Sequence, residues 1–260
     1  WAREKRKPSM AMIDAWANLA VRFQSKTGFV YPDRIGVIDE VARESLFEEV
    51  TGRVAVEVVG QPHLQAQVLN LRGLRADRPP STGGINFVFF SEPVAEDFGR
   101  DVRGFDQFEV FEALVSNLPV SPSLTLWVKP HPREGCKRWN EIVVSHRKKR
   151  NIEVKLAHQS TNEVLSMADA VIGMTSMVLV EAHLLGIPVL SLQLNRKNLG
   201  NPIIEDVCEV VTELEVLAGI VSRFQSEIDN EVFINPKISA VLNNADQRVI
   251  FALERLLQAD

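Results

Sequence analysis

Short apolar runs alternate with amphipathic stretches along most of this chain, and the two patterns predict different elements. The apolar runs predict strands at 8–13, 34–39, 53–59, 85–90, 124–128, 152–156, 170–172, 189–192 and 207–211. The amphipathic stretches predict helices at 40–50, 63–75, 107–117, 138–149, 160–168, 177–185, 213–224 and 245–257. Uninterrupted apolar runs are typical of parallel strands whose two faces are both covered by helices. The alternation therefore predicts an α/β fold built on parallel sheets.

One segment interrupts this alternation. Residues 77–84, DRPPSTGG, have the Pro, Gly and Ser content of an interdomain linker. We therefore expect one α/β domain in 1–76, with too few strands to be complete, and a second one in 85–260. The amphipathic terminal helix at 245–257 is expected to pack back on the first domain.

The stretch 168–194 contains the clearest strand–helix–strand unit. Its first apolar run ends at Gly173, the hydroxyl residues Thr175 and Ser176 precede the helix, and a second apolar run follows Pro188. A helix N-terminus offers unpaired N–H groups and a partial positive charge, which together suit a phosphate. Thr175 and Ser176 are therefore candidate anion-binding residues.

Glu181 is the unusual residue of this helix. It falls in the middle of an apolar face made by Met174, Met177, Val178, Leu184 and Leu185. An ionised carboxylate in such a face costs several kcal/mol unless it is paired or hydrated. It would lie roughly 8 Å along the axis from the helix start, at ~1.5 Å per residue, which fits a ribose beside a diphosphate. The alternative is a capped core helix with Glu181 paired to an Arg or a Lys.

A second candidate segment, Lys129-Pro130-His131-Pro132, directly follows the strand at 124–128. The two prolines hold His131 in a stiff, extended segment, so its imidazole can meet a phosphate with little ordering cost. Lys129 adds a point charge that suits the same group. The alternative is a rigid turn with a solvated histidine. Parallel α/β sheets bind ligands at the carboxyl ends of their strands, where both candidate segments lie.

Charge and cysteine content argue against several classes of protein and of site. The net charge of −5 argues against a general nucleic-acid binder. Cys136 and Cys208 lie far apart without a CxxC motif, so we expect neither a disulfide nor a zinc site, and a reducing compartment. The sequence has no uncharged apolar run of ~18 residues and no signal peptide, which predicts a cytoplasmic protein.

Two further segments each leave two interpretations open. The basic run at 146–150 fits a solvated helix end or attraction to anionic lipid, the latter implying peripheral association with the inner face of a membrane. Asp14 follows the strand at 8–13. It is either a general base for an acceptor hydroxyl or a cap of the next helix.

The sequence VKPHP, followed by ADAVIGMTSMVLVEAHLLGIPVLSL, resembles the C-terminal donor-binding domain of bacterial GT-B glycosyltransferases of capsule and lipopolysaccharide synthesis. An HP pair with a Ser/Thr motif at a helix start is similar to GT-B sialyltransferases and Kdo transferases, which use CMP-sugars. The resemblance implies that His131 and Pro132 contact the nucleotide phosphate. It also implies that the Gly173–Ser176 turn supports this group and that Glu181 binds the ribose. FFSEP looks like the first strand-to-loop junction of such a domain, which places Ser91 at the donor.

The resemblance thus implies a GT-B-like fold, with a Rossmann-type parallel-sheet domain and a second, incomplete α/β domain. Its implied reaction moves a sugar from a CMP- or UDP-linked donor to a hydroxyl of a surface polysaccharide or glycolipid. No metal or other cofactor is expected, because helix N-termini and basic side chains can stabilise the leaving phosphate.

The resemblance is good over 85–200 and weaker over 13–62. The early half of a GT-B N-terminal domain, about 100 residues, is absent from the sequence, and the opening Trp1 leads us to expect residues upstream. The acidic-acidic-Gly motif of the sialyltransferases is also absent. Two alternatives stay open. One is a sugar-nucleotide enzyme like UDP-N-acetylglucosamine 2-epimerase, although that family favours Asp-Ser-Gly-Gly where this chain has Gly-Met-Thr-Ser. The other is a non-catalytic nucleotide-binding module.

Overall fold

The chain divides into two compact units. The computed structural model describes residues 2, 4–16, 18–50, 52–78, 84–118, 124–147, 152–198, 201–226, 228 and 232–258. Unit 1 comprises Trp1–Gln67 and Asn235–Asp260, and unit 2 comprises Val68–Ile234. The division differs from the expected one because it falls within helix α2 (Pro62–Ala76) and assigns the C-terminal residues to unit 1. Of the expected linker, 79–83 lie outside the described residues.

Unit 2 is built on a six-stranded parallel sheet in the order β11-β10-β9-β6-β7-β8. Its strands are β6 (Ile85–Phe90), β7 (Leu124–Lys129), β8 (Glu153–Leu156), β9 (Ala170–Gly173), β10 (Val189–Leu192) and β11 (Glu209–Val211). Counted within the unit, the spatial order is 6-5-4-1-2-3, the doubly wound order of dinucleotide-binding folds. The strand order reverses between β6 and β9, which are hydrogen-bonded neighbours.

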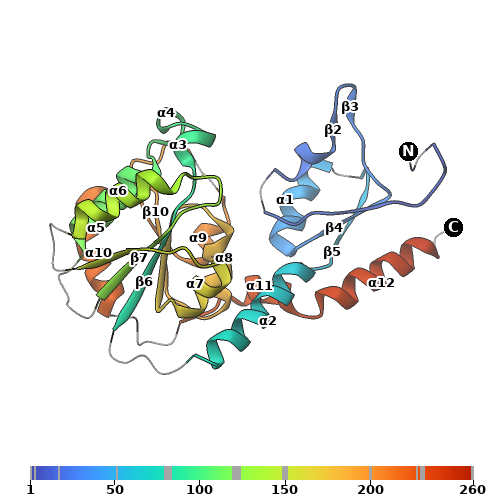
Figure 1. The fold of residues 1–260 in the computed structure, drawn as a ribbon. Helices are drawn as coiled ribbons and strands as arrows, with labels where there is room; N and C mark the ends of the chain where they lie inside the picture. Colours follow the sequence, from blue (N-terminus) through green and yellow to red (C-terminus); the bar gives the residue numbers. More distant parts are fainter. Residues whose placement is uncertain are drawn as a thin grey trace. The chain divides into compact units, whose positions relative to one another are not determined.

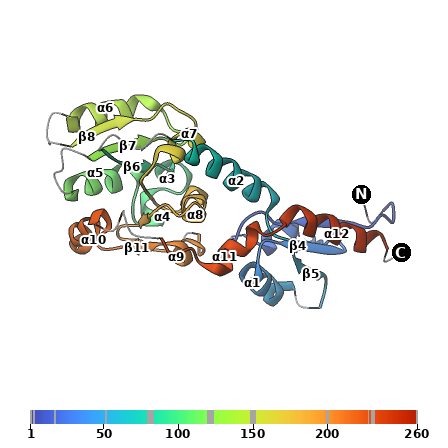
Figure 2. The same ribbon diagram turned by 90° about the horizontal axis from the view of Figure 1, so that it is seen from below.

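Helices cover both faces of this sheet (Figures 1 and 2). One face carries α5 (Gln107–Asn117), α6 (Cys136–Arg147) and α10 (Leu214–Ser226), and the other carries α7 (Thr161–Met167), α8 (Met177–Leu184) and α9 (Ile204–Val207). Asp106 starts α5 by accepting hydrogen bonds from the N–H groups of Phe108 and Glu109, at 2.8 and 2.9 Å. The expected parallel α/β arrangement with buried strands is confirmed.

Unit 1 contains a three-stranded parallel sheet in the order β1-β4-β5, with strands β1 (Met10–Met12), β4 (Arg34–Val37) and β5 (Ala55–Val58). Asp39 starts α1 (Glu40–Val50), since its carboxylate accepts hydrogen bonds from the Ala42 N–H at 2.8 Å and the Trp16 indole N–H at 2.7 Å. The terminal helix α12 (Ala245–Leu257) contacts β4, and its Arg255 pairs with Glu57 of β5. The terminal helix therefore packs with N-terminal segments.

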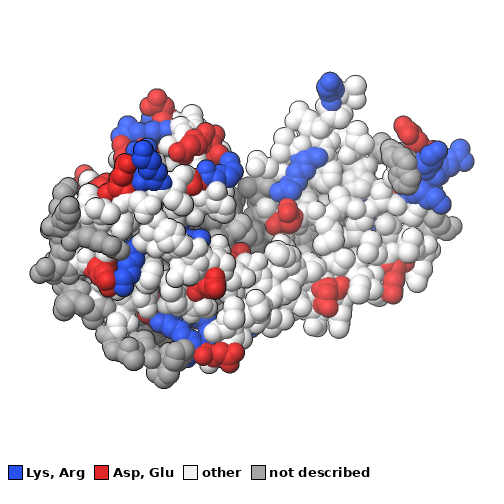
Figure 3. All heavy atoms as spheres, viewed as in Figure 1, with Lys and Arg blue, Asp and Glu red and all other residues white. Residues whose placement is uncertain are grey.

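The remaining elements are short. They are η1 (Ala20–Phe23), β2 (Gln24–Ser25), β3 (Gly28–Phe29), α3 (Val94–Asp97), α4 (Arg100–Arg103), α11 (Pro236–Ser239) and η2 (Ala240–Leu242). Acidic and basic side chains lie side by side over α3 and α4 in Figure 3, and two ion pairs account for part of this pattern. Arg133 pairs with Asp97 at 2.6 Å, as does Arg100 with Glu109. Within the described part of the chain, no helix is long and apolar enough to cross a lipid bilayer.

Candidate functional site

Three neighbouring strands of unit 2 end at the same level. Phe89 of β6 is in register with Val128 of β7 and with Ile172 of β9. The segments that follow these strands, 91–92, 130–132 and 174–176, therefore emerge together at the carboxyl edge of the sheet. This edge includes the point between β6 and β9 where the strand order reverses, which is where open α/β sheets bind ligands.

Glu134 connects two of these segments. Its Oε2 accepts a hydrogen bond from the His131 backbone N–H at 2.7 Å, and its Oε1 accepts one from the Ser91 hydroxyl at 2.9 Å. The Oε1 atom also accepts from the Trp139 indole N–H at 3.1 Å and from the Gln107 side-chain amide at 3.2 Å. One carboxylate thus fixes the loop after β6 to the loop after β7. Our reading of the sequence missed Glu134, although its position three residues after the histidine fits a carboxylate that reaches back to the backbone.

His131 is partly exposed, and its ring is oriented by its own loop. Its Nδ1 accepts a hydrogen bond from the Arg133 backbone N–H at 3.2 Å, so the neutral ring carries its proton on Nε2. An Nε2–H group is a donor that suits a phosphate oxygen. Pro132 is exposed, and the Lys129 ammonium donates to the carbonyl of Gln159 at 2.6 Å. The lysine is therefore held against the loop after β8.

The start of α8 already binds an anion, which is a carboxylate of the chain itself. Glu92 Oε1 accepts hydrogen bonds from the backbone N–H groups of Thr175 and Ser176, at 2.6 and 2.7 Å. Its Oε2 accepts one from the Thr175 hydroxyl at 2.6 Å. Burial raises the pKa of Glu92, while these hydrogen bonds act in the opposite direction. The Ser176 hydroxyl caps the helix by accepting from the Val178 N–H at 3.3 Å.

Gly173 is buried at the end of β9. A Cβ atom at this position would lie 3.0 Å from the Leu179 side chain and 3.4 Å from the Phe90 carbonyl oxygen. The glycine therefore allows β9 to pack closely against β6 and α8, and its contact with a donor stays a prediction. The next carbonyl, of Met174, accepts from the buried Ser191 hydroxyl at 2.6 Å and from the Gln193 amide at 3.2 Å. These hydrogen bonds fix the turn between β9 and α8 to the end of β10.

The predicted apolar face of α8 is wrong in part, since Met174 and Leu184 are buried and its other three apolar residues are not. The side chains that the helix buries are those of Leu179, Val180, Ala182, His183 and Leu184. Glu181 is only partly buried, as are Met177, Val178 and Leu185. The helix is apolar nearly all round, so its apolar positions do not select one face. Glu181 is thus no carboxylate sealed in a core, and its contact with a ribose stays a prediction.

Asp14 lies in unit 1, after β1. Its side chain is 70% exposed and pairs with Arg22 at 3.0 Å. Its role as a general base stays a prediction. Of the basic run, 148–150 lie outside the described residues, and His146 is buried and bonded to Glu112 at 2.9 Å. His146 is therefore neither a solvated helix end nor a lipid contact. Among the residues that the structure describes, no three His, Cys, Asp or Glu side chains are grouped to hold a metal ion.

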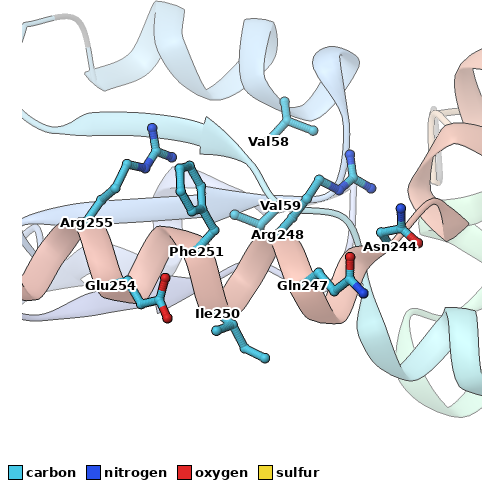
Figure 4. A pocket seen from close by; sticks show the side chains of 9 residues that line it. All are labelled: Val58, Val59, Asn244, Gln247, Arg248, Ile250, Phe251, Glu254 and Arg255. Carbon is cyan, nitrogen blue, oxygen red and sulfur yellow. The ribbon is translucent and has the colours of Figure 1, made fainter.

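Unit 1 contains a pocket of about 640 Å³ along α12 (Figure 4). It is lined by Val58, Val59, Asn244, Gln247, Arg248, Ile250, Phe251, Glu254 and Arg255. None of the residues predicted to bind a donor is among these nine. The pocket along α12 is therefore distinct from the carboxyl edge of the sheet in unit 2.

Comparison with known proteins shows the fold. No protein-family model and no curated protein matches the chain. A solved UDP-GlcNAc 2-epimerase from Neisseria meningitidis, bound to UDP-GlcNAc, is similar at a TM-score of 0.66 and 14% identity, over 98% of this chain and 71% of that one. The chain has a GT-B-like fold. Two further solved structures are similar to this chain to nearly the same degree.

One is a putative UDP-N-acetylglucosamine 2-epimerase from Listeria monocytogenes, with a TM-score of 0.65 and 15% identity, over 98% of this chain and 70% of that one. The other is UDP-GlcNAc 2-epimerase from Methanocaldococcus jannaschii, with a TM-score of 0.61 and 15% identity, over 98% of this chain and 71% of that one. These matches confirm the expected α/β, Rossmann-type fold class of this GT-B-like chain. At such low identity they establish the fold alone.

Proposed function

We propose that this GT-B-like chain binds a nucleotide-sugar at the carboxyl edge of β6, β7 and β9 and transfers the sugar to a hydroxyl of a polysaccharide or glycolipid. One observation carries the proposal. The segments with Ser91, His131 and Thr175–Ser176 lie together where the strand order of a doubly wound sheet reverses. The likeness to a UDP-GlcNAc 2-epimerase structure bound to its substrate supports a nucleotide-sugar as the ligand.

The proposed chemistry uses groups of this edge. The Nε2–H of His131 donates to a phosphate oxygen, and the N–H groups at the start of α8 stabilise the charge that develops on the leaving phosphate. The acceptor oxygen bonds to the anomeric carbon while the bond from that carbon to the phosphate oxygen breaks. The hydroxyl proton passes to a general base. Our candidate for the base, Asp14, belongs to unit 1 and is not a group of this edge. The reaction needs no metal, and we place it in the cytoplasm, at the inner face of the membrane that holds a glycolipid acceptor.

Replacing His131 with alanine is expected to weaken nucleotide binding about tenfold, because one charge-assisted hydrogen bond to the phosphate is lost. Calorimetric titration of CMP, CDP, UDP and GDP into the parent protein and the variant measures this effect. His63→Ala is the matched control, since His63 is an exposed histidine of unit 1. If His131→Ala binds every nucleotide as well as the parent does, the site assignment is wrong.

A second candidate function is epimerisation of a nucleotide-sugar, favoured by the three epimerase structures with TM-scores from 0.61 to 0.66. The two reactions differ in their need for an acceptor. An epimerase converts its nucleotide-sugar when incubated alone, whereas a transferase needs an acceptor hydroxyl. Incubation of UDP- and CMP-sugars with the protein alone, followed by analysis of the sugar, therefore distinguishes the two.

A further inference from the structure

The start of α8 forms a three-donor anion seat, which we define as the backbone N–H groups of Thr175 and Ser176 and the hydroxyl of Thr175. All three donors bind the Glu92 carboxylate, at distances of 2.6 to 2.7 Å. Such short contacts are typical of charge-assisted hydrogen bonds. A backbone N–H has a single hydrogen to donate. A phosphate therefore cannot use these donors while Glu92 holds them.

The position of Glu92 allows its side chain to leave without moving the strand. The preceding residue, Ser91, is fixed by a backbone hydrogen bond to the Lys129 carbonyl at 3.0 Å and by its hydroxyl bond to Glu134. Glu92 itself is bound to the seat through its side-chain oxygens. Freeing the seat therefore requires the Glu92 side chain to move and leaves the hydrogen bonds of Ser91 in place. Burial raises the pKa of Glu92, so the desolvation of the carboxyl group outweighs the stabilisation that its hydrogen bonds give to the charged form.

We propose that Glu92 is an internal substitute for the phosphate of the donor: it fills the three-donor seat of the empty protein and leaves when a nucleotide phosphate binds. The inference rests on the proposed function, since it concerns the same edge of the sheet. Glu92 then determines affinity and specificity, because every donor has to displace a carboxylate. Two anions side by side at this seat would repel each other, so exchange is favoured over joint occupancy.

A permanent structural role of Glu92 predicts the opposite change in nucleotide affinity when the carboxylate is removed. If Glu92 is instead a permanent support of the turn at Thr175 and Ser176, the phosphate binds elsewhere along the edge. Removing the carboxylate would then loosen the turn and weaken binding. The exchange role predicts that removal opens the seat and strengthens binding.

The test compares Glu92→Gln and Glu92→Ala with the parent protein in calorimetric titrations of UDP, CMP and inorganic pyrophosphate. Exchange predicts that both variants bind more tightly than the parent, by about 5- to 50-fold, since each 1.4 kcal/mol changes an affinity tenfold. The glutamine variant keeps a neutral carbonyl acceptor for the seat, so it tests the role of charge with little risk to folding. Glu215→Gln is the matched control, since Glu215 is an exposed acid of the same unit. Its affinities should equal those of the parent.

The amide resonances of Thr175 and Ser176 report directly on the seat. If nucleotides bind to the parent and to both variants equally, or bind the variants more weakly, the exchange role is overturned. Nucleotide binding at this edge then stands, with the phosphate held at His131 and not at the start of α8. If no nucleotide binds, but pyrophosphate shifts both amides in Glu92→Ala and not in the parent, the exchange role stands and the proposed function fails. If none of the three probes binds to any protein, both fail.

Discussion

Replacing Trp139 with alanine is expected to lower the free energy of unfolding of unit 2 by about 4 kcal/mol, the usual cost of truncating a fully buried large aromatic side chain. Trp139 is fully buried in α6. Its ring centroid lies 4.9 Å from that of Phe108, 5.4 Å from that of Phe111 and 6.2 Å from that of Phe89. The substitution therefore leaves a cavity in the centre of an aromatic cluster.

Urea unfolding followed by far-ultraviolet circular dichroism measures this loss. Trp139→Phe is the matched control, because it keeps an aromatic ring in the cluster and removes the indole N–H that donates to Glu134. We expect it to cost less than the alanine variant, with a remainder that reflects the lost hydrogen bond and the smaller ring. A loss below about 1 kcal/mol for the alanine variant would contradict the conclusion that this aromatic cluster stabilises unit 2.

Replacing Glu134 with alanine is expected to lower the free energy of unfolding by about 3 kcal/mol, because the buried Trp139 indole loses its acceptor and the buried Gln107 amide loses one of two. The substitution also removes the acceptor of the Ser91 hydroxyl and of the His131 backbone N–H. We therefore expect nucleotide affinity to fall about tenfold at temperatures where the variant is folded. A residue with a purely structural role would change the stability and leave this affinity unaltered.

Glu141→Ala is the matched control for Glu134→Ala. Glu141 is an exposed acid of α6, and its removal should change the stability by no more than about 0.5 kcal/mol. Because Trp139 and Glu134 share a hydrogen bond, the double variant should lose less stability than the two single losses added together. Strictly additive losses would contradict an energetic coupling between these two side chains.

The fold could be predicted from the sequence wherever local pattern and long-range packing agree. Helix α5 and strand β6 have the expected bounds, since an Asp cap starts the helix and an apolar run broken only by Asn86 makes the strand. The hairpin of β2 and β3 was not predicted, because its strands have two exposed residues each and no apolar periodicity. The buried face of α8 was predicted only in part, because apolar residues surround most of that helix.

The site could be predicted only in part, for a related reason. Parallel strands end at one edge, so the pattern of strands alone places the segments of His131 and of Thr175 and Ser176 at the same edge of the sheet. No comparable sequence pattern indicates the long-range contacts of Glu92 and Glu134, the two carboxylates that connect the loops at this edge. Glu92 binds residues 83 and 84 positions away in the sequence, and Ser91 is 43 positions from Glu134. Contacts of this range depend on the completed sheet.

The most direct test of the proposed nucleotide site is to locate a bound nucleotide by ¹H–¹⁵N spectroscopy. UDP and CMP, each with and without a linked sugar, are titrated into the labelled protein. We expect the largest shifts at the amides of Ser91, Glu92, His131, Thr175 and Ser176, at the carboxyl edge of β6, β7 and β9. Shifts confined to unit 1, for example to the residues of the pocket along α12, would contradict this site, and so would spectra that no nucleotide changes.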